Sequence, residues 1–284
     1  MAFVHVNGIQ LHYTIDGTQG PWITLSHSLA CNLSSWDAQV ELLKDHFRVL
    51  RFDTRGHGQS SAPPGPYTLE QLAEDVDGLL RHLGITQTHW MGISMGGMIG
   101  QTYALTHPGV FLSLILADST SRRPPQAASM WGERIHIAQT EGMQGLLEST
   151  LTRWFTPAYR AKNPDVMARI GKGILETPVN GFCGCCDAIS KIDLLDRLHE
   201  IKCPSLIMVG EHDHGTPPEM SRLMHENIEG SEFVIIPNAI ATNAVIKEIH
   251  FLVNSQLENC QMPSITHAIN IVSVLRSWVI KNMA

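Results

Sequence analysis

Strand and helix signals alternate along the first third of the chain, and this alternation limits the fold more than any other feature. Short apolar runs typical of strands are separated by segments whose apolar residues recur at i, i+3, i+4 and i+7, the spacing of one helix face. Strand–helix–strand units with short connections favour a mostly parallel sheet with helices on both faces, an α/β fold. The predicted strands are residues 3–6, 9–13, 22–25, 47–52, 88–93 and 111–117.

Local signals mark where these elements begin and end. Asn7-Gly8 predicts a tight hairpin turn between the first two strands. The clearest helix spans residues 68–82, because Thr68 and Gln71 have the spacing of a capping box and Gly84 stands at the expected C′ position. Further helices are predicted at 36–46 and 95–106.

The middle of the chain loses the strand signal. Helical patterns at 131–139, 143–155 and 163–176 replace it, and strands resume at 205–209 and 233–236. Between these two strands, Thr216 is predicted to cap a helix that begins with Pro217. The organisation predicted is an α/β core of residues 1–120 and 201–284 with a helical cap at 121–200. The closing helix of the core is expected at 267–281.

Composition narrows the class of partner. The chain has 284 residues, 20 basic and 27 acidic, and a net charge of −7. This balance argues against nucleic acid or an anionic membrane as the main partner. No apolar run reaches the roughly 18 residues of a membrane span, and the first residues lack a signal-peptide pattern. The six cysteines are therefore interpreted as thiols, and a cytoplasmic protein is expected.

The segment Gly92-Ile93-Ser94-Met95-Gly96 matches the G-x-S-x-G motif. It lies between a predicted strand and a predicted helix, the context in which a sharp turn exposes a nucleophilic serine. A glycine-rich chain can contain this pattern by chance, but the flanking elements and Gly97 favour the functional interpretation. We therefore expect Ser94 to be a nucleophile at the N-terminus of a helix.

A serine nucleophile needs a base, which a carboxylate orients, and the chain order in this context is serine, acid, histidine. Asp213 lies in the loop after the strand at 205–209 and is the predicted acid. The alternative is that Asp213 is an ordinary polar loop residue. His212 and His214 flank it, but three consecutive side chains converge poorly on one metal ion, so these histidines are expected in solvent.

Two backbone N–H groups are needed to bind the oxyanion. Met95, directly after the serine, supplies one. Leu29, in the loop after the strand at 22–25, is the candidate for the other. His27 and Ser28 are expected to position that loop, because the chain order argues against His27 as the base.

Several motifs together resemble the α/β-hydrolase fold, and within it the 3-oxoadipate enol-lactonases of aromatic-ring catabolism. The resemblance covers about residues 3–239, including the cap. The motifs are Ser26-His27-Ser28-Leu29, Trp36-Asp37, 52–60 with its Gly56-His57-Gly58, 63–69, the Ser94 turn, Trp131 with Arg134, 181–186, and 210–218.

This resemblance implies hydrolysis of a small, carboxylate-bearing enol-lactone, or of a related ester, without metal or other cofactor. Arg134 is the cation expected to bind the substrate carboxylate, and Trp131 is either a core residue or a wall of the pocket. Arg55 is expected to be structural. The cysteines within 181–186 are adjacent, which suits a metal poorly, so we interpret them as small buried residues of the cap.

The pattern departs from the family where the base should stand. Family members carry the catalytic histidine within about two residues of the last strand, but this chain continues Ile240-Ala241-Thr242-Asn243. His250 is the nearer downstream candidate and His267 the farther one; a third alternative is that no base is properly placed. The sequence thus predicts a lactonase-like serine hydrolase, with a general carboxylesterase or a hydrolase-fold protein of impaired catalysis as alternatives.

Overall fold

The computed structural model describes residues 2–123, 127–237, 239 and 240. Their centre is one sheet, whose strands are β1 (Ala2–Val6), β2 (Ile9–Asp16), β3 (Trp22–Ser26), β4 (Arg48–Phe52), β5 (Thr88–Ile93), β6 (Phe111–Ala117), β7 (Ser205–Gly210) and β8 (Glu232–Ile236). The strand order is β1-β2-β4-β3-β5-β6-β7-β8. β2 is antiparallel to β1 and β4, and every other pairing is parallel.

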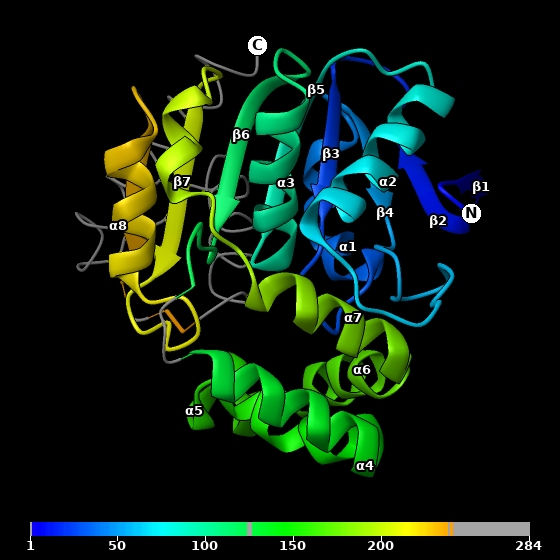
Figure 1. Cartoon of the computed structure of the whole chain (residues 1–284), viewed down its shortest axis with the longest axis vertical. Coiled ribbons are helices and arrows are strands. Elements are labelled where there is room, and N and C mark those ends of the chain that lie inside the picture. The colour runs from blue at the N-terminus through cyan, green and yellow to red at the C-terminus, as the bar shows by residue number, and fades with distance from the viewer. Residues whose placement is uncertain (1, 124–126, 238, 241–284) are drawn as a thin grey trace.

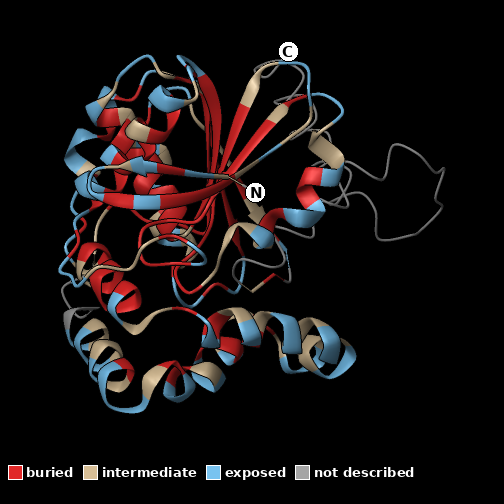
Figure 2. Cartoon of the chain, turned by 90° about the vertical axis from the view of Figure 1, so that its right-hand side faces the viewer, coloured by how far each residue is buried: buried red, intermediate tan, exposed pale blue. Residues whose placement is uncertain are grey.

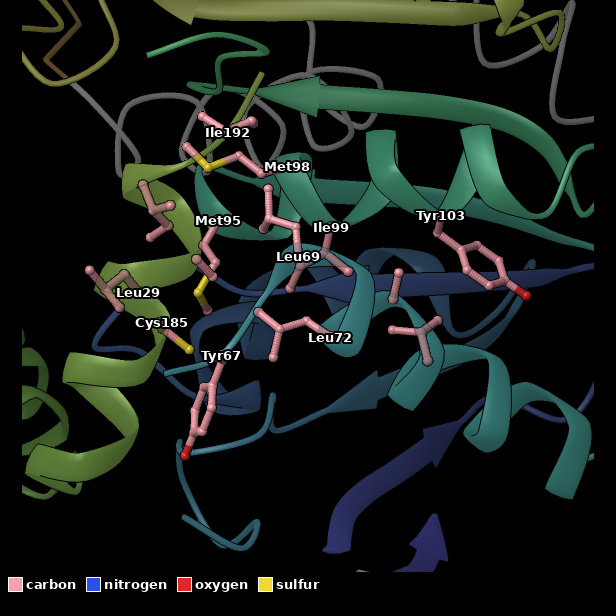
Figure 3. Packing of buried hydrophobic residues seen from close by; sticks show 14 of the residues in the cluster. Leu29, Tyr67, Leu69, Leu72, Met95, Met98, Ile99, Tyr103, Cys185 and Ile192 are labelled. Carbon is pink, nitrogen blue, oxygen red and sulfur yellow. The ribbon is translucent and has the colours of Figure 1, made fainter. Parts of the chain in front are cut away.

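Helices cover both faces of this sheet, as the alternation of signals predicts (Figure 2). On one face, Trp36 and Val40 pack in a buried cluster with the strands. On the other, Leu72, Ile99 and Met224 belong to a second cluster, part of which Figure 3 shows. The helices of the core are η1 (Leu33–Trp36), α1 (Asp37–Leu43), α2 (Leu69–His82), α3 (Met95–Thr106), η2 (Leu195–Glu200) and α8 (Pro218–Asn227).

The structure contains the turn and the helix ends that the sequence predicts at three places. Asn7 and Gly8 have φ values of 46° and 75°, the left-handed conformations of a tight hairpin turn. The Thr68 hydroxyl accepts a hydrogen bond from the Gln71 N–H at the start of α2. Gly84 follows the end of α2 with φ of 65°. These three predictions from sequence are confirmed.

Two predicted helices differ from the structure at their ends. Thr216 does not cap α8, because its hydroxyl donates instead to Asp213 at 2.8 Å, and Pro217 occupies the N-cap position. The helix predicted at 36–46 is shorter: α1 ends at Leu43, and a 3₁₀ turn capped by Asn32 precedes it. The first difference arises from a side-chain hydrogen bond that the helical pattern does not contain.

Four helices between β6 and β7 lie together beyond the C-terminal ends of the parallel strands (Figure 1). They are α4 (Ala127–Trp154), α5 (Pro157–Lys162), α6 (Pro164–Leu175) and α7 (Val179–Ser190). Gly142, with φ of 70°, breaks α4 between the two helices predicted at 131–139 and 143–155. An isolated bridge pairs Arg122 with Asp193 where the chain enters and leaves this group. None of the described helices is long and apolar enough to span a bilayer.

α7 approaches the core at backbone distance. A Cβ on Gly181 would overlap the carbonyl oxygen of Gly56, and one on Gly184 would overlap the ring of Tyr67. The Cys185 thiol lies 3.7 Å from the carbonyl oxygen of Arg55, and Figure 3 shows Cys185 beside Tyr67. The small residues of α7 are therefore what allows the cap helices to lie directly on the loop after β4.

We expect Gly181→Ala to destabilise the protein by about 1–3 kcal/mol, because the added methyl group meets rigid backbone. Gly132→Ala is the matched control: Gly132 is also a helical glycine, it is exposed, and a Cβ there meets nothing within 4 Å. Helix propensity alone should make that variant more stable by up to about 1 kcal/mol. Urea unfolding measures both. Equal stability of the two variants would contradict the close contact of α7.

Candidate active site

Ser94 forms the sharp turn between β5 and α3. Its φ and ψ are 51° and −112°, a conformation that non-glycine residues rarely adopt. The neighbouring glycines are required by space, since a Cβ on Gly92 would overlap the backbone of Gly96, and one on Gly96 would overlap the carbonyl of Ser26. Within the motif 92–96 only Ser94 is not fully buried. The strained turn therefore presents this hydroxyl to a cavity.

That cavity lies between the sheet edge and the cap helices. Ser94 and Leu29 line it from the core, Asp213 from the loop after β7, and Trp131 and Arg134 from α4. These five predicted site residues come from four segments that are far apart in the sequence. The fold thus brings them to one place, while their chemical roles stay predictions.

The start of α3 supplies backbone donors beside Ser94. Met95 is the first residue of this helix, so its N–H has no intrahelical acceptor and carries part of the positive end of the helix dipole. The hydroxyl of Ser119 donates to the Ser94 carbonyl at 2.9 Å and holds the turn from the adjacent strand end. This geometry suits stabilisation of negative charge near Ser94.

Two buried histidines hold the loop that carries Leu29. His27 Nδ1 lies 2.8 Å from the Ser28 carbonyl, and its Nε2 accepts from the Thr54 N–H at 3.0 Å. His57 Nε2 accepts from the Ala30 N–H at 3.0 Å. Both nitrogens of His27 are therefore engaged in the fold, in line with a positioning role.

Asp213 is buried and oriented by its own loop. Its carboxylate accepts hydrogen bonds from the N–H groups of Gly215, at 2.6 Å, and Thr216, at 2.9 Å, and from the Thr216 hydroxyl. The His212 N–H donates to the carbonyl of Ala239 at 2.8 Å. The chain just after β8 therefore lies against the loop of the predicted acid.

Two of the three predicted triad members, Ser94 and Asp213, lie among the described residues. His250 and His267 lie outside the described residues. Of the described residues that line the cavity, none is a histidine. His212 and His214 are exposed at the surface of the acid loop, as expected.

Two charged residues of the cavity were not predicted. Asp118 follows β6 directly with φ of 43°, and its carboxylate accepts from the Gly210 N–H at 3.0 Å. Its position at the C-terminal end of a parallel strand was a usable signal, because side chains at this edge gather around one site. Arg153, near the end of α4, had no such signal, since a helical pattern does not show which face meets a cavity.

The remaining predicted residues have clear surroundings. Arg55 forms a buried ion pair with Asp75 at 2.7 Å, which is a structural role. Cys183, Cys185 and Cys186 are buried free thiols in α7. Burial raises the pKa of Cys186 to about 12, so this thiol is protonated at neutral pH.

Comparison with known proteins shows a consistent relationship. The sequence profile of the alpha/beta hydrolase fold matches residues 21–240. The chain is 32% identical to 3-oxoadipate enol-lactonase 2 of Acinetobacter baylyi over 236 residues, which are 83% of this chain and 88% of that protein. The enol-lactonase from Burkholderia xenovorans LB400 is 36% identical with a TM-score of 0.83, covering 98% of this chain and 100% of that one. A thermophilic esterase from Thermogutta terrifontis is 28% identical with a TM-score of 0.84 over the full length of both chains.

The buried His57 predicts a specific pH dependence of stability. Burial, with a smaller effect of His27, lowers the pKa of His57 to about 3. Between pH 6.5 and about 3, His57 is therefore protonated in the unfolded chain but neutral in the folded protein. The free energy of unfolding should fall by about 1.4 kcal/mol per pH unit from this residue as the pH drops from 6.5 towards 3.

His57→Gln keeps an acceptor for the Ala30 N–H but does not titrate. The stability difference between the wild type and this variant should therefore shrink as the pH falls from 6.5 to 4, as measured by urea unfolding at each pH. Parallel stability curves for the two proteins would show that His57 is not held neutral.

Proposed function

The chain belongs to the alpha/beta hydrolase fold family, and on that premise we propose that this hydrolase uses Ser94 to cleave a small, carboxylate-bearing lactone. The observation that carries the proposal is the cavity itself. It is lined by a strained serine, a buried carboxylate and a cationic side chain, Arg134. A lactonase of this type needs all three: a nucleophile, an acid to orient the base, and a group that binds the substrate carboxylate.

We propose the following reaction. The Ser94 hydroxyl attacks the lactone carbonyl while a histidine, oriented by Asp213, takes its proton. The N–H groups of Leu29 and Met95 bind the oxyanion. The ring C–O bond then breaks, and the histidine gives its proton to the ring oxygen, which becomes an enol on the acyl chain still bound to Ser94. Water, activated by the same histidine, hydrolyses the acyl-enzyme and restores Ser94.

His250 is proposed as the base, with His267 as the alternative. The hydrogen bond from His212 to Ala239 supports a base from the segment that follows, because it holds the chain after β8 against the loop of Asp213. A base in that segment corresponds to the order serine, acid, histidine.

The choice of a lactone rests on the relatives. Two enol-lactonases align with most of this chain, and we extend their substrate class, and with it a place in aromatic-ring catabolism, to this protein. The esterase relative supports the alternative of a general carboxylesterase.

A second candidate is a member of the family that binds ligand without turnover. The observation that favours it is the lack of a histidine among the described residues lining the cavity, together with the histidine-free stretch 237–249 after β8. A missing base typically lowers kcat by several orders of magnitude.

Ser94→Ala should lower hydrolysis by at least about 1000-fold without changing the melting temperature. The substrates are a carboxylate-bearing enol-lactone and p-nitrophenyl esters from acetate to dodecanoate. Ser149→Ala is the control, because Ser149 does not line the cavity. We expect kcat/KM to be highest for the lactone. Preference for long acyl esters would instead favour the carboxylesterase, and wild-type turnover by Ser94→Ala would exclude Ser94.

A fluorophosphonate probe distinguishes an active serine hydrolase from a protein that binds ligand without turnover. Stoichiometric labelling of Ser94 within minutes, located by peptide mass spectrometry, requires an activating base. His250→Ala should then slow labelling at least about 100-fold, whereas His267→Ala should not. The reverse result assigns the base to His267, and no labelling of the wild type supports the binding protein.

A further inference from the structure

Two arginines of α4 face the cavity of Ser94. Arg134 comes from the part of α4 before the break at Gly142 and Arg153 from the part after it. The sequence resemblance pointed only to Arg134. The two side chains lie on different sides of the helix break, so they present two separate cations to one small cavity.

The Arg134 guanidinium is held by aromatic rings rather than by acids. It lies 5.2 Å from the ring centre of Trp131 and 5.5 Å from that of Phe182. Such contacts fix the plane of the group but leave its N–H edges free to bind a ligand. Among the described residues, Arg134 has neither an ion pair nor a hydrogen-bond acceptor. Burial, together with the charge of Arg153, lowers its pKa to about 10, so it remains charged at neutral pH.

Arg153 lines the same cavity beside the acid loop. Its side chain passes Gly215, where a Cβ would lie 3.7 Å from the Arg153 Cδ. Burial lowers the pKa of Arg153, and the negative charge of Asp213 acts in the opposite direction. The two do not form an ion pair, and no other described residue pairs with Arg153.

The acids of the cavity are already occupied. Asp213 accepts three hydrogen bonds from Gly215 and Thr216, and Asp118 accepts one from Gly210. The described part of the cavity therefore holds two carboxylates that already accept backbone hydrogen bonds and two half-buried guanidiniums that have no ion-pair partner among the described residues. Removing a cation from water without pairing it is costly. An arrangement of this kind is suited to anionic ligands.

The chemistry of ring opening supplies such a ligand. When water cleaves a carboxylate-bearing lactone, the acyl C–O bond breaks and the acyl carbon becomes a second carboxylate with release of a proton. The ring oxygen keeps the electron pair of that bond, takes up a proton as an enol and becomes a ketone. The substrate thus carries one carboxylate and the product two.

We propose that Arg134 and Arg153 together form a two-point site for small linear dicarboxylates, in which Arg134 binds the carboxylate already present on the substrate and Arg153 the one that hydrolysis creates. The inference rests on the proposed function for the direction of the reaction. It adds Arg153 as a ligand-binding residue, and it implies that the product class inhibits the enzyme more strongly than monocarboxylates do.

Isothermal titration of the full chain with adipate and hexanoate tests this site without turnover. Adipate should bind at least about tenfold more tightly than hexanoate, the effect of one additional charge-assisted contact. Added KCl should reduce this preference. Equal affinities for the two acids would overturn the proposal.

Variants test which arginine binds each carboxylate of the ligand. Arg153→Gln should lower adipate affinity about tenfold and leave hexanoate affinity within about threefold, whereas Arg134→Gln should weaken both. Arg169→Gln is the matched control, because Arg169 is an exposed cap arginine that does not line this cavity. It should change neither affinity. If Arg153→Gln fails to fold, Arg153→Lys is the second variant. It keeps the positive charge but loses the paired N–H donors of the guanidinium, so its affinity for adipate should be intermediate.

The outcomes separate this inference from the proposed function. Binding of adipate that depends on Arg153, without hydrolysis of any lactone, would leave the dicarboxylate site standing and refute the lactonase. Lactone hydrolysis with no preference for adipate, or with a preference that Arg153→Gln does not change, would refute the two-point site alone.

Discussion

The backbone contact between Gly181 of α7 and Gly56 of the loop after β4 is the interaction on which the arrangement of the site depends. It allows the cap helices to lie directly on the core, so that Trp131 and Arg134 reach the cavity of Ser94. A side chain at either glycine would separate the two backbones. The small residues of α7 therefore determine how closely the cap helices approach the core, although Gly181, Gly184 and Cys185 do not line the cavity.

The same loop also connects the cap with the segment that carries Leu29. Cys185 of α7 lies 3.9 Å from His57 Nδ1, and His57 Nε2 accepts from the Ala30 N–H. Cap, loop and the segment carrying Leu29 are thus joined through one buried, neutral imidazole. A group of this kind positions backbone donors at little electrostatic cost, because it satisfies an N–H without introducing a charge.

The electrostatics of the cavity divide into two kinds of group. The carboxylates of Asp118 and Asp213 are held by backbone N–H groups, which fixes their direction. The guanidinium of Arg134 is held by aromatic rings, which leaves its donors open, and Arg153 has no ion-pair partner among the described residues. Fixed acids suit the orientation of a base, while open cations suit recognition of an anionic ligand.

The local structure of several elements was predicted from the sequence alone. The β5–Ser94–α3 turn and the capped helix α2 are set by residues close together in the chain, so apolar periodicity and glycine placement sufficed to predict them. The parallel sheet pairs distant strands, and it was predicted from the alternation of strand and helix signals. The start of α8 and the position of Arg153 could not be predicted, because each depends on a partner brought near only by folding. Thr216 bonds Asp213 instead of capping α8, and Arg153 meets the cavity through the break at Gly142. Sequence periodicity records which side of an element is apolar, whereas a site is made by contacts between elements, and only the tertiary structure decides those.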